Sequence, residues 1–103
     1  MIRVSVLYPN QPGATFDMDY YLNQHIPMLR RLLGAALTDV QVDVGLGGAM
    51  PGTPAPYVTI CCLSFEALDS FQRAFAPHMG TIVADVPKYT NTQPTVQISE
   101  VKL

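Results

Sequence analysis

His25 has the position in this chain that most clearly indicates chemistry. It lies between Leu22 and Leu29 on the apolar stripe of a helix predicted over residues 17–33, so its ring should point inward. Pro27 has no amide hydrogen to donate, and the helix should therefore be deformed beside the histidine. An inward-facing imidazole there can serve as a general base in a cleft. The alternative is a core histidine that is hydrogen-bonded to the backbone.

Four other polar side chains are candidates for the same site. Tyr8 ends a predicted strand on its helix-facing side, where its phenol would either orient a substrate or fill the core. His78 follows Pro77 in the first turn of a short helix, where the helix dipole disfavours a charged ring. It is either a proton acceptor or a solvated loop residue. Asp85 and Tyr89 lie one helical turn apart, which suits a site or a capping contact.

The side chains expected to contact a substrate are Tyr21, Leu22 and Leu29 on the first helix, together with Asp85 and Tyr89, which lie one helical turn apart on either side of Pro87. No spacing of Cys, His, Asp and Glu fits a metal centre, and no glycine-rich loop leads into a helix as phosphate binding requires. We therefore expect no metal and no cofactor. The formal net charge is −2 and the six Lys and Arg residues are scattered, which excludes the basic surface of a nucleic-acid-binding protein.

Length and composition predict one globular domain over residues 1–103, with 49% hydrophobic residues and no apolar run that could span a bilayer. A strand pattern begins at Ile2 and leaves no room for a signal peptide, so we expect a cytoplasmic protein. Cys61 and Cys62 are neighbours in an apolar strand and should point to opposite faces. They are expected to be buried, unreactive thiols rather than a disulfide.

The hydrophobic pattern predicts an α+β fold with the element order β-α-β-β-α-β. Strands are expected over residues 2–8, 40–46, 57–63 and 96–99, and the third should be central because both of its faces are apolar. The first helix should begin at Asp17 and end at Gly34. A second helix should start at Ser64 or Glu66, followed by a short one from Pro77 to Pro87. The Gly- and Pro-rich stretch 47–56 is expected to be a long connection.

The two faces of the predicted sheet differ in polarity. The face under the helices is expected to carry Ile2, Val4, Val6, Val40, Val42, Val44, Val58, Ile60, Val96 and Ile98. The other face is expected to carry Ser5, Leu7, Gln41, Thr59, Cys61, Leu63, Gln97 and Ser99. This second face is too apolar for open water and too polar for a dry core, which predicts a homodimer formed by packing two sheets together.

The stretch from Phe16 to Pro27, FDMDYYLNQHIP, resembles the F-D-x-x-Y-Y-x-x-x-H-x-P signature of the EthD family, named after ethyl tert-butyl ether degradation. The resemblance extends over the whole chain. It implies a ferredoxin-like dimeric α/β barrel with helices on one face of a four-stranded antiparallel sheet, and a pocket between helices and sheet lined by His25. Relatives in that superfamily include cofactor-free monooxygenases, dehydratases, isomerases and haem-degrading enzymes. The EthD branch accompanies a cytochrome P450 system, and its members are often labelled reductases.

Three kinds of function follow as hypotheses. The leading one is a small enzyme acting on an apolar or aromatic molecule, with His25 as acid or base and Tyr8 and Tyr21 positioning the substrate. The second is a non-catalytic carrier of a hydrophobic metabolite. The third is haem binding through His25 or His78. An oxidoreductase of the reductase type is implied by the family labels alone, because no dinucleotide-binding feature is present.

Overall fold

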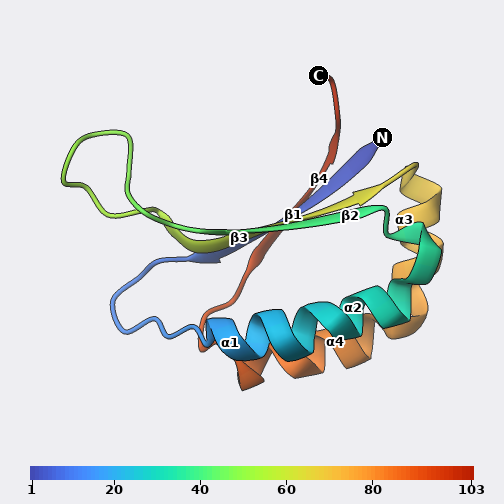
Figure 1. The fold of residues 1–103 in the computed structure, drawn as a ribbon, viewed down its shortest axis with the longest axis horizontal. Helices are drawn as coiled ribbons and strands as arrows, with labels where there is room; N and C mark the ends of the chain where they lie inside the picture. The colour runs from blue at the N-terminus through green and yellow to red at the C-terminus, as the bar shows by residue number, and fades with distance from the viewer.

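The computed structural model describes residues 1–103 as a sheet with all its helices on one side (Figure 1). The strands are β1 (Ile2–Pro9), β2 (Asp39–Val44), β3 (Tyr57–Phe65) and β4 (Thr95–Glu100). The helices are α1 (Met18–Tyr20), the π-helical turn η1 (Tyr21–His25), α2 (Ile26–Leu33), α3 (Leu68–Phe75) and α4 (Met79–Asp85). Three short 3₁₀ turns follow α2, α3 and α4, namely η2 (Gly34–Ala36), η3 (Ala76–His78) and η4 (Val86–Lys88).

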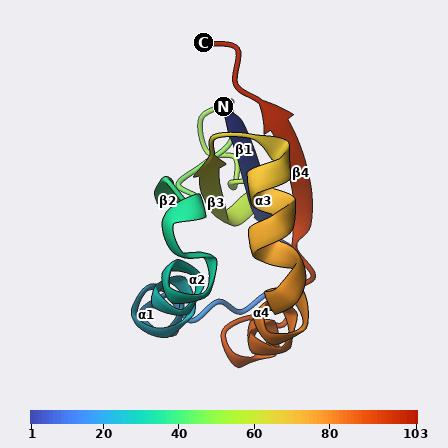
Figure 2. The ribbon, with the colours of Figure 1, turned by 90° about the vertical axis from the view of Figure 1, so that its right-hand side faces the viewer.

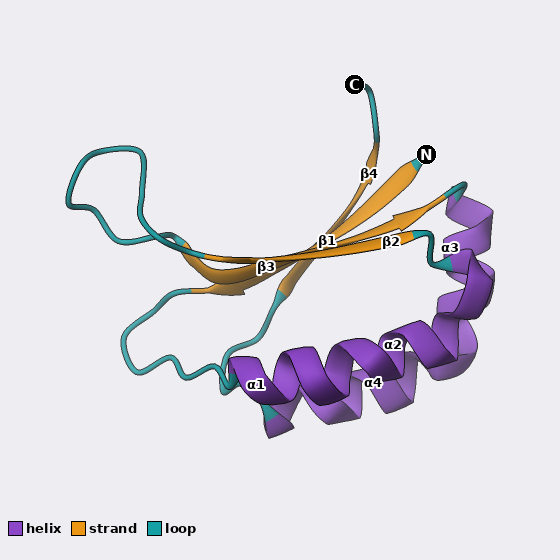
Figure 3. Ribbon diagram, viewed as in Figure 1, coloured by secondary structure: helices purple, strands orange, loops and turns teal.

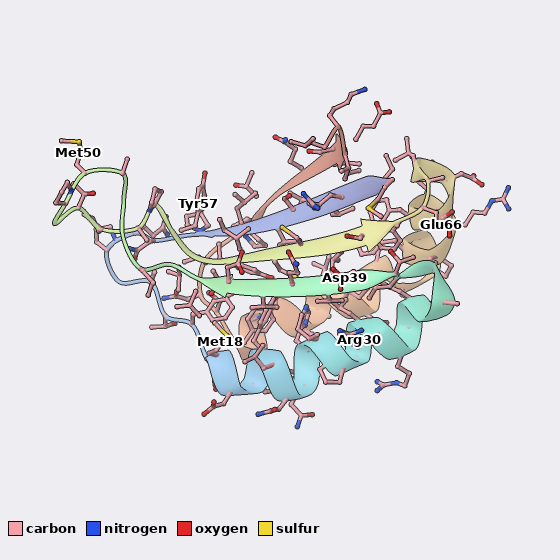
Figure 4. The ribbon with its side chains drawn as sticks, turned by 45° about the horizontal axis from the view of Figure 1, so that its top comes forward. Met18, Arg30, Asp39, Met50, Tyr57 and Glu66 are labelled. Atoms are coloured by element: carbon pink, nitrogen blue, oxygen red, sulfur yellow. The ribbon has the colours of Figure 1, made fainter.

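The strands pair in the order β2-β3-β1-β4, and every pair is antiparallel. This arrangement confirms the predicted α+β ferredoxin-like fold and the inner position of the third strand. The helix α2 lies below the β2 side of the sheet, and α4 lies below the β4 side (Figure 2). Side chains from both layers occupy the space between sheet and helices, whereas the loop that carries Met50 extends beyond the sheet (Figure 4). The other sheet face has no helix over it (Figure 3).

The first helical segment begins and ends where the sequence predicts. The Asp17 carboxylate accepts a hydrogen bond from the backbone N–H of Tyr20 at 3.0 Å, as an N-cap residue does. Gly34 closes α2 with a φ of 59°, a left-handed value that glycine adopts without strain. The deformation expected beside Pro27 is a π turn, in which the N–H of Ile26 donates to the carbonyl of Tyr21.

The buried face of this helical segment differs from the prediction. The side chains that point to the sheet are Tyr21, His25, Ile26, Leu29 and Leu33. Leu22, which was expected inside, is 46% exposed, and Leu32 is only partly buried. The reason is the π turn, which has more residues per turn than the regular helix assumed in the prediction. The spacing of 100° per residue therefore does not hold across residues 21–25.

The face assigned to the third strand was wrong. The cross-strand pairs place Thr59 opposite Tyr8, Cys61 opposite Val6, and Leu63 opposite Val4, so these β3 residues face the helices. Ile60 and Cys62 lie on the open face instead. Both faces of this strand are apolar, so alternation alone cannot fix which face turns inward. The strand also continues to the fully buried Phe65, so Ser64 belongs to β3, and α3 starts only at Leu68.

Candidate functional site

A cavity of about 340 Å³ lies between the helices and the sheet, and we call it the inner cavity. Its walls come from β1, β3, η1, α2, α3, α4 and the segment around β4. The lining side chains are Val4, Val6, Tyr8, Tyr21, His25, Leu29, Cys61, Leu63, Phe71, Phe75, Met79, Ile82, Val83, Val86, Tyr89, Pro94 and Val96. His25 is the one lining residue that exchanges a proton readily near neutral pH.

His25 and Asp85 form a buried pair beside this cavity. The imidazole Nδ1 lies 2.8 Å from Oδ2 of Asp85, and both residues are buried. Because a carboxylate only accepts hydrogen bonds, we assign the ring proton to Nδ1. The lone pair of Nε2 is then free to accept a proton. The η1 turn thus presents the ring, and the last residue of α4 holds it in one orientation.

Three tyrosine hydroxyls form a chain of contacts that starts at the free nitrogen, and we call Tyr8, Tyr21 and Tyr89 the hydroxyl cluster. The hydroxyls of Tyr8 and Tyr89 lie 2.7 Å apart, which is a good hydrogen bond. The hydroxyl of Tyr89 lies 3.5 Å from Nε2 of His25, and that of Tyr8 lies 3.5 Å from that of Tyr21. At these longer distances the contacts are weak, so Nε2 and the cluster retain capacity to bind a ligand oxygen.

The electrostatics of the pair favour a neutral imidazole beside a carboxylate. Burial lowers the pKa of His25 from its usual value of 6.5, and the hydrogen bond and charge of Asp85 oppose this in part. Burial alone would raise the pKa of Asp85, but hydrogen bonds from His25 and Tyr20 and the charges of His25 and Lys88 lower it overall. The Tyr20 hydroxyl donates to Oδ1 at 2.8 Å, and Lys88 Nζ lies 3.6 Å from the same oxygen.

The phenols and the thiol of the cavity are held in their neutral forms. Burial raises the pKa of Tyr8, Tyr21 and Tyr89 above the usual value of 10.0. Burial likewise raises the pKa of the Cys61 thiol to about 11. At neutral pH these groups therefore donate hydrogen bonds and do not act as anionic nucleophiles. The chemistry available here is proton transfer at Nε2, with phenols to hold an oxygen atom.

The structure brings most of the predicted site residues together. His25, Tyr8, Tyr21, Leu29 and Tyr89 line the inner cavity, and Asp85 contacts His25 from behind. Two predicted residues, Leu22 and His78, do not line this cavity, since Leu22 faces outward and His78 lies in η3.

Tyr20 makes a contact with the site that the sequence analysis did not anticipate. Its hydroxyl reaches Asp85 across 65 residues of sequence. No local signal in the sequence reveals this contact, because it exists only once α1 packs beside α4.

The haem alternative does not fit the arrangement of the histidines. Nδ1 of His25 contacts Asp85, and the Tyr89 hydroxyl lies in front of Nε2, so an iron atom would have to displace that phenol. His78 does not face the cavity. No group of three or more His, Cys, Asp or Glu residues is arranged to hold a metal ion. None of the helices has the length and apolar character that crossing a bilayer requires.

Comparison with known proteins identifies the family. Residues 13–93 match the model of the EthD domain. This chain belongs to the EthD family. The matched region includes His25, Asp85 and Tyr89 of the site, whereas Tyr8 precedes it. None of the proteins with curated functions matches the chain.

Solved structures of EthD proteins have the same fold. An EthD-like protein from Ralstonia eutropha JMP134 is 37% identical, with a TM-score of 0.94 over 99% of this chain and 92% of its own. An ethyl tert-butyl ether degradation family protein from Bacillus halodurans C-125 is 21% identical, with a TM-score of 0.75 over 99% of both chains. A dimeric ferredoxin-like protein of unknown function from Thermobifida fusca YX has a TM-score of 0.59 at 17% identity, over 97% of this chain and 90% of its own.

Proposed function

We propose that this EthD protein is an acid–base enzyme that moves a proton on a small apolar or aromatic molecule carrying one oxygen function. The observation that carries the proposal is the His25–Asp85 pair, at 2.8 Å, beside a cavity whose other walls are almost entirely apolar. An apolar cavity with a few convergent polar groups is typical of a small-molecule site. Burial lowers the pKa of His25, so its imidazole is neutral at physiological pH and can accept a proton.

Each residue has a distinct task in the proposed reaction. Nε2 of His25 removes a proton from the bound molecule, and the imidazolium that forms is stabilised by the Asp85 carboxylate on Nδ1. One hydroxyl of the Tyr8–Tyr89 pair donates a hydrogen bond to the ligand oxygen on which negative charge develops, while the other hydroxyl donates to its tyrosine neighbour. Return of the same proton to another atom completes an isomerisation, and its delivery to a leaving hydroxyl completes a dehydration. The proton count balances in both cases.

Hydrogen exchange tests this proposal without knowledge of the natural substrate. The protein is incubated in deuterium oxide with aromatic ketones such as tetralone, and uptake of deuterium next to the carbonyl is followed by mass spectrometry. We expect exchange faster than in buffer for a ligand that fits, and loss of that acceleration in His25→Ala. The His78→Gln variant, altered at the histidine outside the cavity, should retain it. Equal acceleration by His25→Ala would refute the assignment of the base.

A non-catalytic carrier is the second candidate, and the almost wholly apolar lining of the inner cavity favours it. A carrier needs the cavity but not the proton transfer. It would bind ketones and phenols, as seen in thermal shifts, and would accelerate exchange in none of them. The reductase-type chemistry, the cytochrome P450 partner and the cytoplasmic location stay predictions, because they rest on the resemblance or on the sequence alone.

We also propose that the protein is a homodimer joined through the open face of the sheet. Ser5, Leu7, Ile60 and Cys62 lie together on this face, where cross-strand pairing places Ser5 opposite Cys62 and Leu7 opposite Ile60. These side chains are only partly covered within one chain. Two such faces packed against each other would bury these apolar side chains. The neighbour from Thermobifida fusca is itself dimeric, which supports a homodimer.

A further inference from the structure

A second hollow of about 510 Å³ adjoins the inner cavity on the surface, and we call it the outer groove. The two hollows share four side chains, namely Val83, Val86, Pro94 and Val96. Val83 and Val96 are 58% and 56% exposed, so the shared rim is open and apolar. A molecule held wholly inside the cavity would leave this rim in water. A longer molecule would cover it, at a gain of roughly 25 cal/mol for each Å² of apolar surface.

The outer groove is more polar than the inner cavity, but none of its side chains is charged. Its remaining walls are Pro87 and the segment from Thr90 to Gln93. None of its lining residues is Asp, Glu, Lys, Arg or His, so nothing there would neutralise a charged ligand group. A neutral group that forms hydrogen bonds matches these walls, because burying an unpaired charge against them would be costly.

Gln93 is the polar side chain of the groove that has no partner in the protein. Asn91 is already engaged, since its Oδ1 accepts from the N–H of Thr15 and its Nδ2 donates to the carbonyl of Gly13. The hydroxyls of Thr90 and Thr92 lie 3.1 Å apart and bond to each other. Gln93 forms no side-chain hydrogen bond and is exposed, so its amide can both donate to and accept from a ligand.

We propose that the ligand is an elongated, neutral molecule, with its oxygen function and apolar body in the inner cavity and a neutral hydrogen-bonding tail in the outer groove against Gln93. This inference rests on the proposed function and specifies its substrate class. Tyr8, Tyr21 and His25 line only the inner cavity, so the reacting end is inside and the tail is outside. Gln93, which contacts the tail of the ligand, therefore determines affinity and selectivity and does not take part in the proton transfer.

A matched set of phenols tests the inference. Displacement of the fluorescent probe N-phenylnaphthylamine gives Kd for para-butylphenol, para-hydroxyphenylbutanamide and para-hydroxyphenylbutanoate, which differ in the end of the tail. We expect the amide to bind about 3- to 10-fold more tightly than para-butylphenol, as one added hydrogen bond provides, and the carboxylate to bind more weakly than the amide. Gln93→Ala should abolish the advantage of the amide and leave Kd for para-butylphenol unchanged.

The control is Gln72→Ala, an exposed glutamine on α3 that lines neither hollow. It should behave as the wild type does with all three phenols. The tail assignment is overturned if para-butylphenol binds as tightly as the amide, or if the amide still binds more tightly in Gln93→Ala. Either result leaves the proposed function intact. If none of the phenols displaces the probe, the cavity does not hold an oxygen-bearing ring, and both proposals fall.

Discussion

Nδ1 of His25 lies 2.8 Å from the Asp85 carboxylate, although 60 residues separate the two in the sequence. The π turn η1 carries the ring, and the C-terminal end of α4 carries the carboxylate. Tyr20 and Lys88 hold the other carboxylate oxygen, so the acid is positioned from both sides. This relationship decides which imidazole nitrogen is basic, and the following predictions depend on it.

Replacing Asp85 by Asn tests the orientation of the base. The amide can donate to Nδ1, which would favour the tautomer with its proton on Nε2 and remove the free lone pair. We expect exchange or turnover to fall by about 10²- to 10⁴-fold, with ligand affinity changed little. Asp69→Asn is the matched control, because this carboxylate is exposed on α3 and pairs with Arg73. Full activity in Asp85→Asn would show that the pair does not serve catalysis.

The stability of the protein should fall as the pH is lowered below about 6.5. The pKa of His25 is lowered by burial, so the unfolded chain binds this proton at a higher pH than the folded chain does. Unfolding is therefore favoured as the pH falls from 6.5 towards the folded pKa. Asp85, with its pKa below the usual 3.8, adds a second loss in the same direction at lower pH, where only the unfolded carboxylate is protonated.

Urea denaturation at about pH 7.5 and at about pH 5.0 measures the first of these effects. We expect the wild type to lose more unfolding free energy between the two pH values than His25→Gln does. His78→Gln controls for the loss of a histidine outside the cluster. If His25→Gln and the wild type lose the same unfolding free energy, the His25 ring is not buried in its neutral form.

The hydrogen bond between Tyr8 and Tyr89 should be measurable as a coupling free energy in a double-mutant cycle. The two hydroxyls lie 2.7 Å apart and are buried, so Tyr8→Phe and Tyr89→Phe should each cost about 0.5–1.5 kcal/mol of unfolding free energy. The double variant should lose less than the sum, because the shared bond is already broken by either change. Tyr57→Phe, a half-buried tyrosine at the start of β3 without a side-chain hydrogen bond, should stay within about 0.5 kcal/mol of the wild type. Strict additivity would argue against the cluster.

How much of this site can be predicted from the sequence depends on how far apart in the chain the contacting residues lie. Asp17, Pro27 and Gly34 act on their own helical turns, so their effects on the first helical segment follow from local rules. The inward position of His25 follows from its spacing to Leu29. Its partner Asp85 does not, because that contact requires α4 to pack beside η1. Asp85 was singled out beside Tyr89, but its bond to the histidine is a result of the tertiary fold.

Two errors of the sequence analysis have equally physical causes. Leu22 was placed inside because regular helical spacing was applied across a stretch that forms a π turn. The faces of β3 were exchanged because Ile60 and Cys61 are both apolar, and either would satisfy a buried face. Only the pairing of β3 with β1, which places Cys61 opposite Val6, decides between them. Patterns within one strand carry no information about this register.

Val83→Trp should narrow the way into the inner cavity. Val83 lines both the inner cavity and the outer groove and is 58% exposed, so a larger side chain there can cover the opening without disturbing the core. We expect ligand affinity to fall by at least about tenfold, while the unfolding free energy stays within about 0.5 kcal/mol. Leu22→Trp provides the control, since this residue is exposed on the same side of the sheet but lines neither hollow. Loss of binding in Leu22→Trp would show that the ligand lies elsewhere.

Cys62→Arg should convert a dimer into monomers. Cys62 lies on the open face beside Ser5, and an arginine there would place a guanidinium group from each chain within the proposed interface. In the isolated chain the arginine can extend into water, so the fold should persist.

Sedimentation velocity at micromolar concentration should give a dimer for the wild type and a monomer for Cys62→Arg. Gln24→Arg, on the exposed side of η1, should remain dimeric. A monomeric wild type would remove the proposed interface, and it would then leave Leu7 and Ile60 as an uncovered apolar patch.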